Sequence, residues 1–533
     1  MAADGRQIIP YFDPVNVRVT EAWLMTAHTE SNASGILRRA GSLEASLTAA
    51  GAATLGLRAG EQGWQVLAWA PSAATLPDGL AGATSELEDG VLLVGPANAE
   101  NAAALRGLLP WLRPRAVGTA PSVAVGDRLG LATPGHLRAF RAHPGIAPVL
   151  AQQSERELGR TGRTIAEVVD AATFGALAAG WRDGYGADGD HLKSMEQLDA
   201  SLDAGCSMVT AAPIGVVPDL PADAPRPAIQ AAFAQVPWAA LEDDPAAFAA
   251  RYPAALEVEG GHLPLPPEAL VAAAARFGPA LVQVLAMYRR LVARAGEGTV
   301  EFEVAVDEIE HPTTAVDHVY FATELRRLGV RPQAFAPRFV GEFEKGIDYR
   351  GDLRAFEADL ATHAALARVL GPYKLSVHSG SDKFSVYPSV ARETRGLVHL
   401  KTSGTSYLEA LRTVAALEPE LLRRVWRVAL EAYATARASY HVSATVAGMP
   451  EPERLSAAEL AGLLDRPDAR EILHVTFGAV LGADPLRGEL RSLLWTEREA
   501  YWDRLAVHIG RHLAPFEPEV DGRPRHRGED NEE

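Results

Sequence analysis

Short apolar, β-branched runs alternate with helical stretches along the chain after about residue 161. Four of these runs end in a polar cluster, and they cover residues 300–308, 333–342, 374–383 and 395–404. Helical periodicity follows or separates them, for example over residues 315–330 and 407–417. Strands that alternate with helices predict a parallel sheet, and a chain of this length favours a barrel over a short open sheet. We therefore predict an α/β fold built on a TIM-like (β/α) barrel, with its chemistry at the carboxyl ends of the strands.

The remaining segments divide the chain around this barrel. Before it, short strands and helices alternate and predict an N-terminal α/β region, and proline-rich stretches interrupt the barrel as an insertion. After it the pattern becomes helical, and the charged end HRGEDNEE is expected to be disordered. The predicted boundaries are 1–150 for the N-terminal α/β region, 151–410 for the barrel core with its insertion at about 213–296, 411–520 for the helical C-terminal region and 521–533 for the tail.

Composition excludes several classes of protein. The chain has 533 residues, and 51 basic against 68 acidic residues give it a net charge of −17. Such a surface repels phosphate backbones, and no basic stripe offsets it, so nucleic-acid binding is not expected. A single cysteine, Cys206, excludes an internal disulfide framework and a zinc ribbon.

The sequence pattern predicts neither a signal peptide nor a membrane helix. The first residues lack a basic stretch followed by an apolar core, and no run approaches the roughly 18 apolar residues that a membrane helix needs. We expect a cytoplasmic protein whose partner is a small molecule, a sugar or sugar acid, and neither nucleic acid nor a membrane. A homo-oligomer is compatible with these observations.

Two segments offer groups for proton transfer. In GADGDHLKS, Asp190 is adjacent to His191, so a carboxylate can move a proton beside an imidazole that binds a metal. In VEFEVAVDE, period-two alternation places Glu303 on one face with Glu301 and Asp307. Burial among apolar neighbours would raise the pKa of Glu303 and suit it to acid–base work, whereas a salt bridge to a lysine is the plainer alternative.

A metal site is predicted from three strand ends. His191, Glu342 and His378 each follow a strand-like run, and a barrel would bring such ends together. Two imidazoles and a carboxylate are suitable ligands for Zn²⁺, Mn²⁺, Fe²⁺, Co²⁺ or Ni²⁺. His399, in the middle of a strand, is either a buried core histidine or a further ligand.

Polar and basic side chains near the same strand ends predict substrate contacts. Lysine and serine side chains can bond to the hydroxyls and carboxylate of a sugar acid, and an acidic protein needs local positive charge to attract an anion. The candidates are Lys193, Lys345, Asp382, Lys383 and Lys401.

Six motifs in consistent order resemble those of the tagaturonate/fructuronate epimerases, a family that also includes ketohexose 4-epimerases for tagatose and fructose. They are GADGDHLKS, FEVAVDE, APRFVGEFEKGIDYRGD, SVHSGSDKFSVYP, VHLKTSGTSYLEALR and LHVTFGAVL. The resemblance implies a TIM-like barrel, a divalent metal and an isomerase of carbohydrate metabolism.

Carried over position by position, the resemblance implies roles for several residues. Asp190 matches the proton acceptor, Glu303 the proton donor, and His191 and His378 metal ligands, with Glu342 chosen as the remaining ligand on position and chemistry. One departure is TAAPIG, where the family pattern leads us to expect an aspartate and Thr210 begins the segment. The preference between uronate and neutral sugar depends on such pocket positions.

The inverted carbon lies β to the ketone, so simple enolisation cannot invert it. Retro-aldol cleavage followed by aldol closure is the preferred route, and a hydride shift is the alternative. Glu308 is the second candidate for the acid–base role of Glu303. Two other functions fit the same residues: a metal-dependent aldolase acting on a keto-sugar acid, and a non-catalytic sugar-acid-binding barrel protein.

Overall fold

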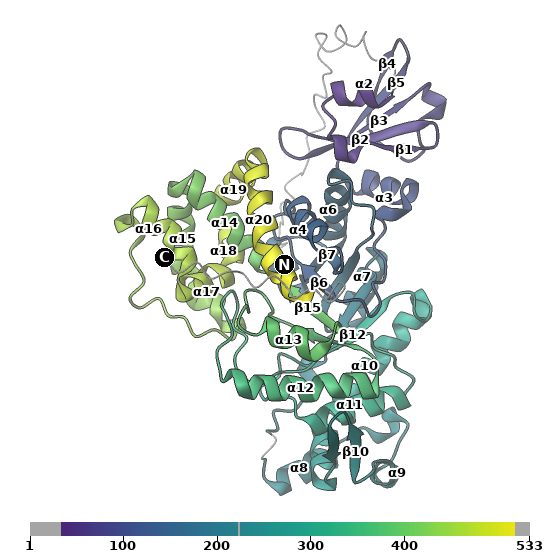
Figure 1. The fold of residues 1–533 in the computed structure, drawn as a ribbon, viewed down its shortest axis with the longest axis vertical. Coiled ribbons are helices and arrows are strands. Elements are labelled where there is room, and N and C mark those ends of the chain that lie inside the picture. The colour runs from purple at the N-terminus through teal and green to yellow at the C-terminus, as the bar shows by residue number, and fades with distance from the viewer. Residues whose placement is uncertain (1–32, 222–223, 518–533) are drawn as a thin grey trace, which may run out of the picture. The chain divides into compact units, whose positions relative to one another are not determined.

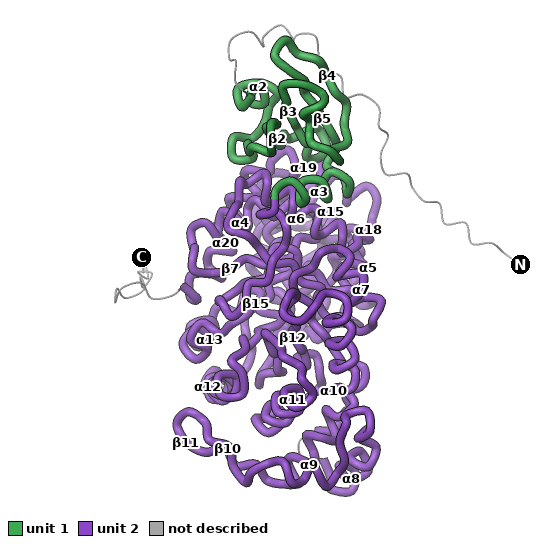
Figure 2. Tube along the Cα trace, turned by 90° about the vertical axis from the view of Figure 1, so that its right-hand side faces the viewer, with its two compact units in different colours: residues 1–109 green, residues 110–533 purple. Residues whose placement is uncertain are grey.

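The computed structural model describes residues 33–221 and 224–517 (Figure 1). The chain forms two compact units, one ending at Leu109 and the other starting at Pro110 (Figure 2). The predicted boundary at residue 150 is therefore too late. Two barrel strands, at Ser122–Val125 and Ala147–Ser154, lie before it and belong to the second unit.

The first unit is built on an antiparallel five-stranded sheet in the order β1-β2-β3-β5-β4. Leu67, Leu92 and Val94 from strands of this sheet pack with Leu37 of helix α2 to form its core. The elements are α2 (Ala33–Arg39), β1 (Thr48–Ala50), β2 (Ala53–Ala59), β3 (Trp64–Ala70), β4 (Ala83–Leu87), β5 (Gly90–Pro96) and α3 (Ala99–Leu108).

The second unit contains a closed barrel of eight parallel strands, as the alternating pattern predicts. Each strand pairs in parallel with its neighbours, and β12 closes the ring against β9. The strands are β6 (Ser122–Val125), β7 (Ala147–Ser154), β8 (Gly186–Leu192), β9 (Met208–Ala211), β12 (Glu301–Ala305), β13 (Ala334–Ala336), β14 (Lys374–Val377) and β15 (Val398–Thr402).

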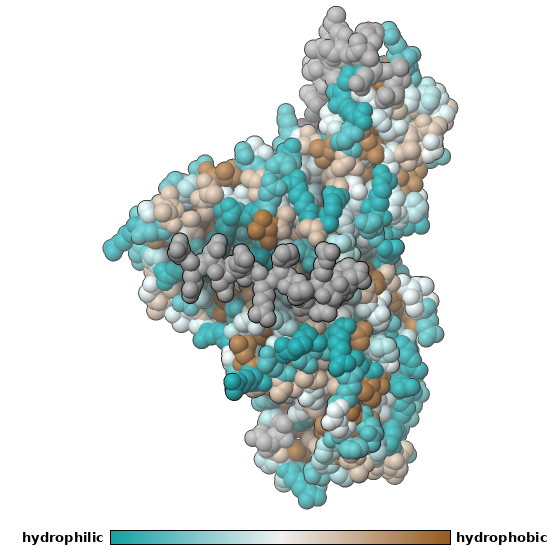
Figure 3. Space-filling view, in the orientation of Figure 1, coloured by the Kyte–Doolittle hydropathy of each residue, from teal (hydrophilic) through white to brown (hydrophobic). Residues whose placement is uncertain are grey.

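Helices connect the strands and cover the outside of the barrel (Figure 1). Helix α12, for example, is amphipathic: it buries Phe356 and Leu360 and exposes Arg354. Figure 3 shows hydrophilic residues gathered around α12 and α13 on this face. The connecting helices are α4 (Thr133–Ala142), α5 (Glu155–Thr161), α6 (Ile165–Ala178), α7 (Met195–Asp203), α10 (Pro267–Ala295), α11 (Ala315–Arg327), α12 (Leu353–Leu370) and α13 (Tyr387–Thr394).

The side-chain alternation of β12 sets what points into the barrel. The ring of Phe302 contacts Tyr288 of α10, with 5.2 Å between centroids, so Phe302 faces the helices. Because successive residues of a strand point to opposite faces, Glu301 and Glu303 face the interior. Strand β12 thus places carboxylate side chains in the interior of the barrel.

The proline-rich insertion contains α8 (Arg226–Phe233), α9 (Pro245–Arg251) and a hairpin of β10 (Ala255–Val258) with β11 (Gly261–Pro264). Helix α10 lies within the predicted range but packs on α7 and α11 as a barrel helix. It is long and apolar enough to cross a membrane by length and composition, yet 72% of its most apolar window is buried inside the fold, as in the core helix of a globular domain.

Beyond β15 the described chain is helical as far as residue 516. The last long helix, α20, packs against α4 and α14 and so returns to the barrel. The predicted tail, 521–533, lies outside the described residues. The helices are α14 (Thr405–Leu417), α15 (Pro419–Ala436), α16 (Ala457–Gly462), α17 (Pro467–Val475), α18 (Phe477–Gly482), α19 (Leu486–Thr496) and α20 (Arg498–Leu513).

Candidate active site at the carboxyl end of the barrel

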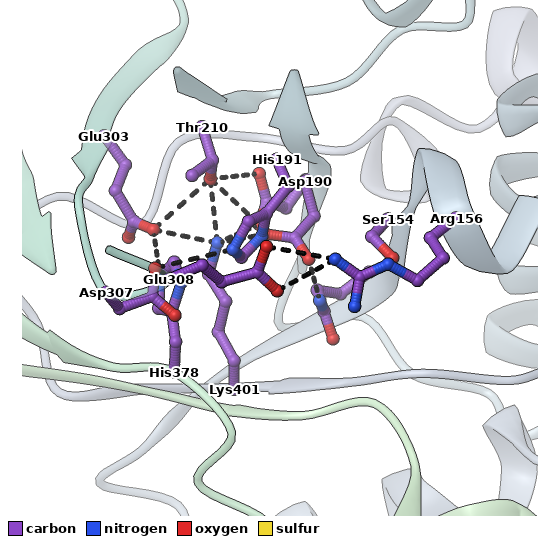
Figure 4. A network of polar contacts seen from close by, with 12 residues as sticks. Ser154, Arg156, Asp190, His191, Thr210, Glu303, Asp307, Glu308, His378 and Lys401 are labelled. Atoms are coloured by element: carbon purple, nitrogen blue, oxygen red, sulfur yellow. Dashed lines mark hydrogen bonds and ion pairs between the residues drawn. The ribbon is translucent and has the colours of Figure 1, made fainter. Parts of the chain in front are cut away.

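Side chains from four strands meet at the carboxyl end of the barrel (Figure 4). Asp190 and His191 lie near the end of β8, and Glu303 lies in β12. His378 follows β14 directly, and Lys401 precedes the last residue of β15. The barrel thereby joins Lys401 to Asp190 by a 2.8 Å hydrogen bond, although 211 positions separate them in the chain.

Three potential metal ligands converge beside this group. Asp307 Oδ1 lies 3.0 Å from His378 Nδ1 and 3.4 Å from His191 Nε2. Within the described chain, these three atoms are buried and make no hydrogen bond of good geometry. Buried polar atoms are normally satisfied, so two imidazole nitrogens and a carboxylate oxygen that lie together without a hydrogen bond suit a bound cation. Two imidazoles and a carboxylate fit a divalent transition metal.

The other ring nitrogen of each histidine contacts a second carboxylate. His191 Nδ1 lies 2.8 Å from Asp190 Oδ1, and His378 Nε2 lies 2.5 Å from Glu303 Oε1. A carboxylate in this place fixes the tautomer and ring orientation of a ligating histidine. His191 also has a φ of +55°, in the left-handed region, so its backbone is strained in the conformation that presents the ring.

Lys401 holds the carboxylates together. Its Nζ lies 2.8 Å from each of Asp188, Asp190 and Glu303, and 2.8 Å from Thr210 Oγ1. An ammonium group has three hydrogen-bond donors, and these contacts occupy them. Lys401 therefore lies in the site, as predicted, but its charge is already neutralised by the protein.

The charge of this cluster favours a bound cation. Lys401 is surrounded by more carboxylates than one ammonium can balance, and Asp307 adds another beside the histidines. Burial raises the pKa of Asp188 to about 6 against the opposing effect of Lys401. Burial would lower the pKa of His191 and of His378, but the neighbouring carboxylates, Asp307 among them, outweigh burial and raise both. The cluster therefore attracts positive charge, which a divalent ion would also supply.

The pKa of Glu303 differs from the one predicted from the sequence. Burial alone would raise its pKa, but the charges of Lys401 and His378 outweigh burial and lower it. The expectation of a raised pKa is therefore wrong, and the alternative of a lysine salt bridge is confirmed at 2.8 Å. Sequence reasoning correctly predicted that Glu303 is buried, but it could not identify Lys401 as the partner that the ring of strands brings to it.

A cavity of about 410 Å³ opens onto the cluster. Asp190, His191, His378 and Lys401 form part of its wall, whereas Glu303, which is fully buried, does not. Glu308, the second acid–base candidate, does line it. Its basic wall residues are Arg128, Arg156, Lys193, Lys345 and Lys401.

Glu342 is not brought into the ligand group. Its side chain is 43% exposed and pairs with His441 Nε2 at 2.8 Å, while its backbone pairs with that of Arg350. Asp307 lies where Glu342 was expected. The sequence pattern had grouped Asp307 with Glu303, but Asp307 lies two residues beyond the end of β12, so strand alternation alone could not single it out as a ligand.

Two of the residues predicted to contact the substrate bond to other parts of the protein instead. Asp382 pairs with His508 at 2.7 Å and with Arg470 at 3.1 Å, on the side of the loop that faces α20. Lys383 is buried and donates from Nζ to the carbonyl oxygens of Glu344, Ile347 and Ser381. Burial lowers the pKa of Lys383 to about 7. Neither residue lines the cavity, whereas Lys193 and Lys345 do.

His399 belongs to the barrel interior. Its Nδ1 lies 2.8 Å from Ser122 Oγ, and burial lowers its pKa well below the ordinary value, so it is neutral. The structure places it with core residues and not with the ligand group. Thr210, the departure from the family pattern, donates to Asp188 at 3.1 Å and accepts from Lys401, so it belongs to the carboxylate cluster.

Comparison with known proteins agrees with the resemblance in the motifs. A family model described as tagaturonate epimerase matches residues 46–516. A tagaturonate/fructuronate epimerase of Thermotoga maritima is 39% identical over 438 residues, which cover 82% of this chain and 89% of that protein. The native crystal structure of fructuronate-tagaturonate epimerase UxaE from Cohnella laeviribosi matches with a TM-score of 0.84 at 34% identity, covering 91% of this chain and 99% of that one. A glycerol complex of the same enzyme matches equally well, with a TM-score of 0.84 and 34% identity over 91% of this chain and 99% of that one. This chain belongs to the tagaturonate epimerase family.

Proposed function

We propose that this protein is a metal-dependent epimerase that interconverts D-tagaturonate and D-fructuronate. The observation that carries the proposal is the convergence of His191 Nε2, Asp307 Oδ1 and His378 Nδ1 beside the cavity, in a chain of this family. D-tagatose and D-fructose have the same relation at the inverted carbon and lack the carboxylate, so they are the neutral substrate pair.

His191, Asp307 and His378 would hold the metal, and their chemistry suits Zn²⁺, Mn²⁺, Fe²⁺, Co²⁺ or Ni²⁺. When bound, a divalent ion acts as a Lewis acid that polarises the ketone of the substrate. Asp190 and Glu303 orient the two histidines through the ring nitrogens that face away from Asp307.

Retro-aldol chemistry fits the groups around the cavity. Asp190 removes the proton from the hydroxyl on the inverted carbon, and the neighbouring C–C bond breaks to give an aldehyde and an enediolate. The aldehyde turns over, the bond forms on its other face, and the new alkoxide takes a proton. No free fragment has to leave the site.

The second proton comes from Glu303 in this proposal. Because its low pKa leaves Glu303 ionised at rest, it first receives, through Lys401, the proton that Asp190 has taken, and then returns that proton to the new alkoxide through the same lysine. Glu303 is buried away from the cavity, but its Oε1 lies 2.8 Å from Lys401 Nζ, and Lys401 lines the wall. Lys401 also contacts Asp190 at 2.8 Å, so it connects the two carboxylates. Lys193 and Lys345 supply positive potential at the cavity for an anionic sugar.

Product analysis tests the function. Purified protein, stripped with a chelator and reloaded with each candidate metal, is incubated with tagaturonate, and the products are separated by chromatography. We expect fructuronate and no smaller fragment. Accumulation of two shorter products would assign the chain as an aldolase, and an unchanged sugar with every metal would contradict the proposal.

A further inference from the structure

One ion pair in the cavity wall joins two groups that the proposed mechanism leaves unused. Arg156 Nη2, from α5, lies 3.0 and 3.1 Å from the two carboxylate oxygens of Glu308 (Figure 4). Both side chains are partly exposed, at 29% and 27%. The pair lines the cavity that reaches Asp190 and His191, and also an adjacent hollow of about 470 Å³ bordered by Asp307.

Arg156 is presented to the cavity in a fixed orientation. Its guanidinium lies over the ring of Tyr440, 5.0 Å from the centroid, which restricts the plane of the fork. Both hydrogen bonds to Glu308 come from Nη2. A guanidinium has five N–H donors arranged for two-point contact with a carboxylate. Arg156 already binds a carboxylate in this structure, that of Glu308.

The other cations of the wall are less suited to this contact. Arg128 is committed to Glu157 at 2.7 Å in a pair whose side chains are only 2% and 5% exposed. Lys401 is saturated by carboxylates, as described above. Lys345 donates to Ser379 and, like Lys193, offers a point charge without the planar fork of arginine.

We propose that Arg156 binds the carboxylate of the sugar-acid substrate, and that Glu308 is the resident carboxylate which the substrate displaces from it. The inference rests on the proposed function, because it takes the ligand of this cavity to be a sugar acid. It makes Arg156 the residue that distinguishes a uronate from a neutral ketohexose, and Glu308 the residue that limits how tightly the uronate binds.

Calorimetric binding to the full-length, metal-loaded protein tests the role of Arg156 without requiring turnover. The ligands are tagaturonate and tagatose, which differ in the carboxylate. We expect Arg156→Gln to weaken tagaturonate binding about 10- to 100-fold, the scale of a lost charge-assisted contact, and to change tagatose binding less than about threefold. Arg156→Lys, which keeps the charge and loses the fork, should fall between.

Arg160→Gln is the matched control. Arg160 lies on the same helix and also over Tyr440, at 4.7 Å, but it bonds to Ser439 and does not line the cavity. Its loss removes one positive charge from the same neighbourhood, so an electrostatic effect without direct contact would appear in both variants. We expect the preference for tagaturonate to survive in Arg160→Gln.

Glu308→Gln tests the displacement. Without the competing carboxylate, tagaturonate should bind several-fold more tightly, and this gain should vanish when Arg156→Gln is added. The inference is overturned if Arg156→Gln weakens both sugars equally or neither, if Glu308→Gln weakens tagaturonate, or if the wild type does not prefer the uronate. A wild type that binds tagaturonate through Arg156 but does not epimerise it would refute the proposed function alone.

Discussion

Each histidine of the candidate metal site is bonded to a carboxylate through one ring nitrogen and faces Asp307 with the other. The third ligand is therefore the most informative single position. Asp307→Asn should lower metal affinity at least tenfold, because it removes the charge and the better oxygen donor. Glu342→Gln, which changes the sequence-predicted ligand, should leave it unchanged. Competition against a chromophoric chelator measures both, and equal losses would contradict the assignment.

The acid–base carboxylates make a second prediction at this scale. With metal at saturation, Asp190→Asn and Glu303→Gln should lower kcat about 100-fold or more, the usual scale for general acid–base groups. Each should also weaken metal binding roughly tenfold, because each orients a ligating histidine. Steady-state kinetics at several metal concentrations separate the two effects. If Glu303→Gln keeps near-normal kcat while Glu308→Gln does not, the proton donor is Glu308.

The contrast between Asp307 and Glu342 shows where sequence reasoning ends for single residues. Alternation within β12 places Glu303 correctly, because a strand fixes the side of every residue in it. Asp307 lies two residues beyond the strand end at Ala305, where turn geometry decides the direction of the side chain. The ion pairs of Lys401 join strands far apart in the chain, so no local pattern could indicate them.

At the scale of elements, α20 is tied to the loop that follows β14. His512 Nε2 accepts from the backbone N–H of Asp382 at 3.0 Å, and Nδ1 donates to the carbonyl of His508 at 2.9 Å. A proton on Nε2 would place its N–H against the backbone N–H of Asp382, so two donors would face each other without an acceptor. Consistently, burial lowers the pKa of His512 from 6.5 to about 4.

This link predicts a pH dependence of stability. Between pH 6.5 and 4 the unfolded chain binds a proton at His512 that the folded chain excludes, so the free energy of unfolding falls as the pH falls through this range. The contribution reaches roughly 3 kcal/mol. The free energy of unfolding, measured with denaturant at pH 7 and pH 5, should depend less on pH in His512→Gln than in the wild type. The difference in slope should correspond to about one proton taken up on unfolding. An unaltered slope in His512→Gln would contradict the link.

The barrel was predictable from its elements because strand and helix patterns alternate from β12 to β15. The first strands of the barrel were not predictable in this way. β6 has only four residues, and β7 ends in two glutamines and a serine, so neither resembles a long apolar strand in the sequence. Helix α10 follows the insertion without a break in composition, and only its packing on α7 and α11 shows that it belongs to the barrel.

For the molecule as a whole, the mechanism predicts the fate of one hydrogen. Retro-aldol cleavage breaks a C–C bond and never the C–H bond of the inverted carbon. Deuterium placed on that carbon should therefore remain there through many turnovers in water, as mass spectrometry or NMR of the product would show. Wash-out into solvent would exclude this route and indicate direct proton abstraction.

The central claim is that a metal held by His191, Asp307 and His378 makes this chain an epimerase. Titrating metal into chelator-stripped protein, while following conversion of tagaturonate to fructuronate, tests it most directly. The account predicts no conversion without metal, a linear rise to saturation at about one ion per chain, and no rise at that stoichiometry in His378→Ala. Full conversion by the stripped protein, or an unchanged titration in His378→Ala, would contradict it.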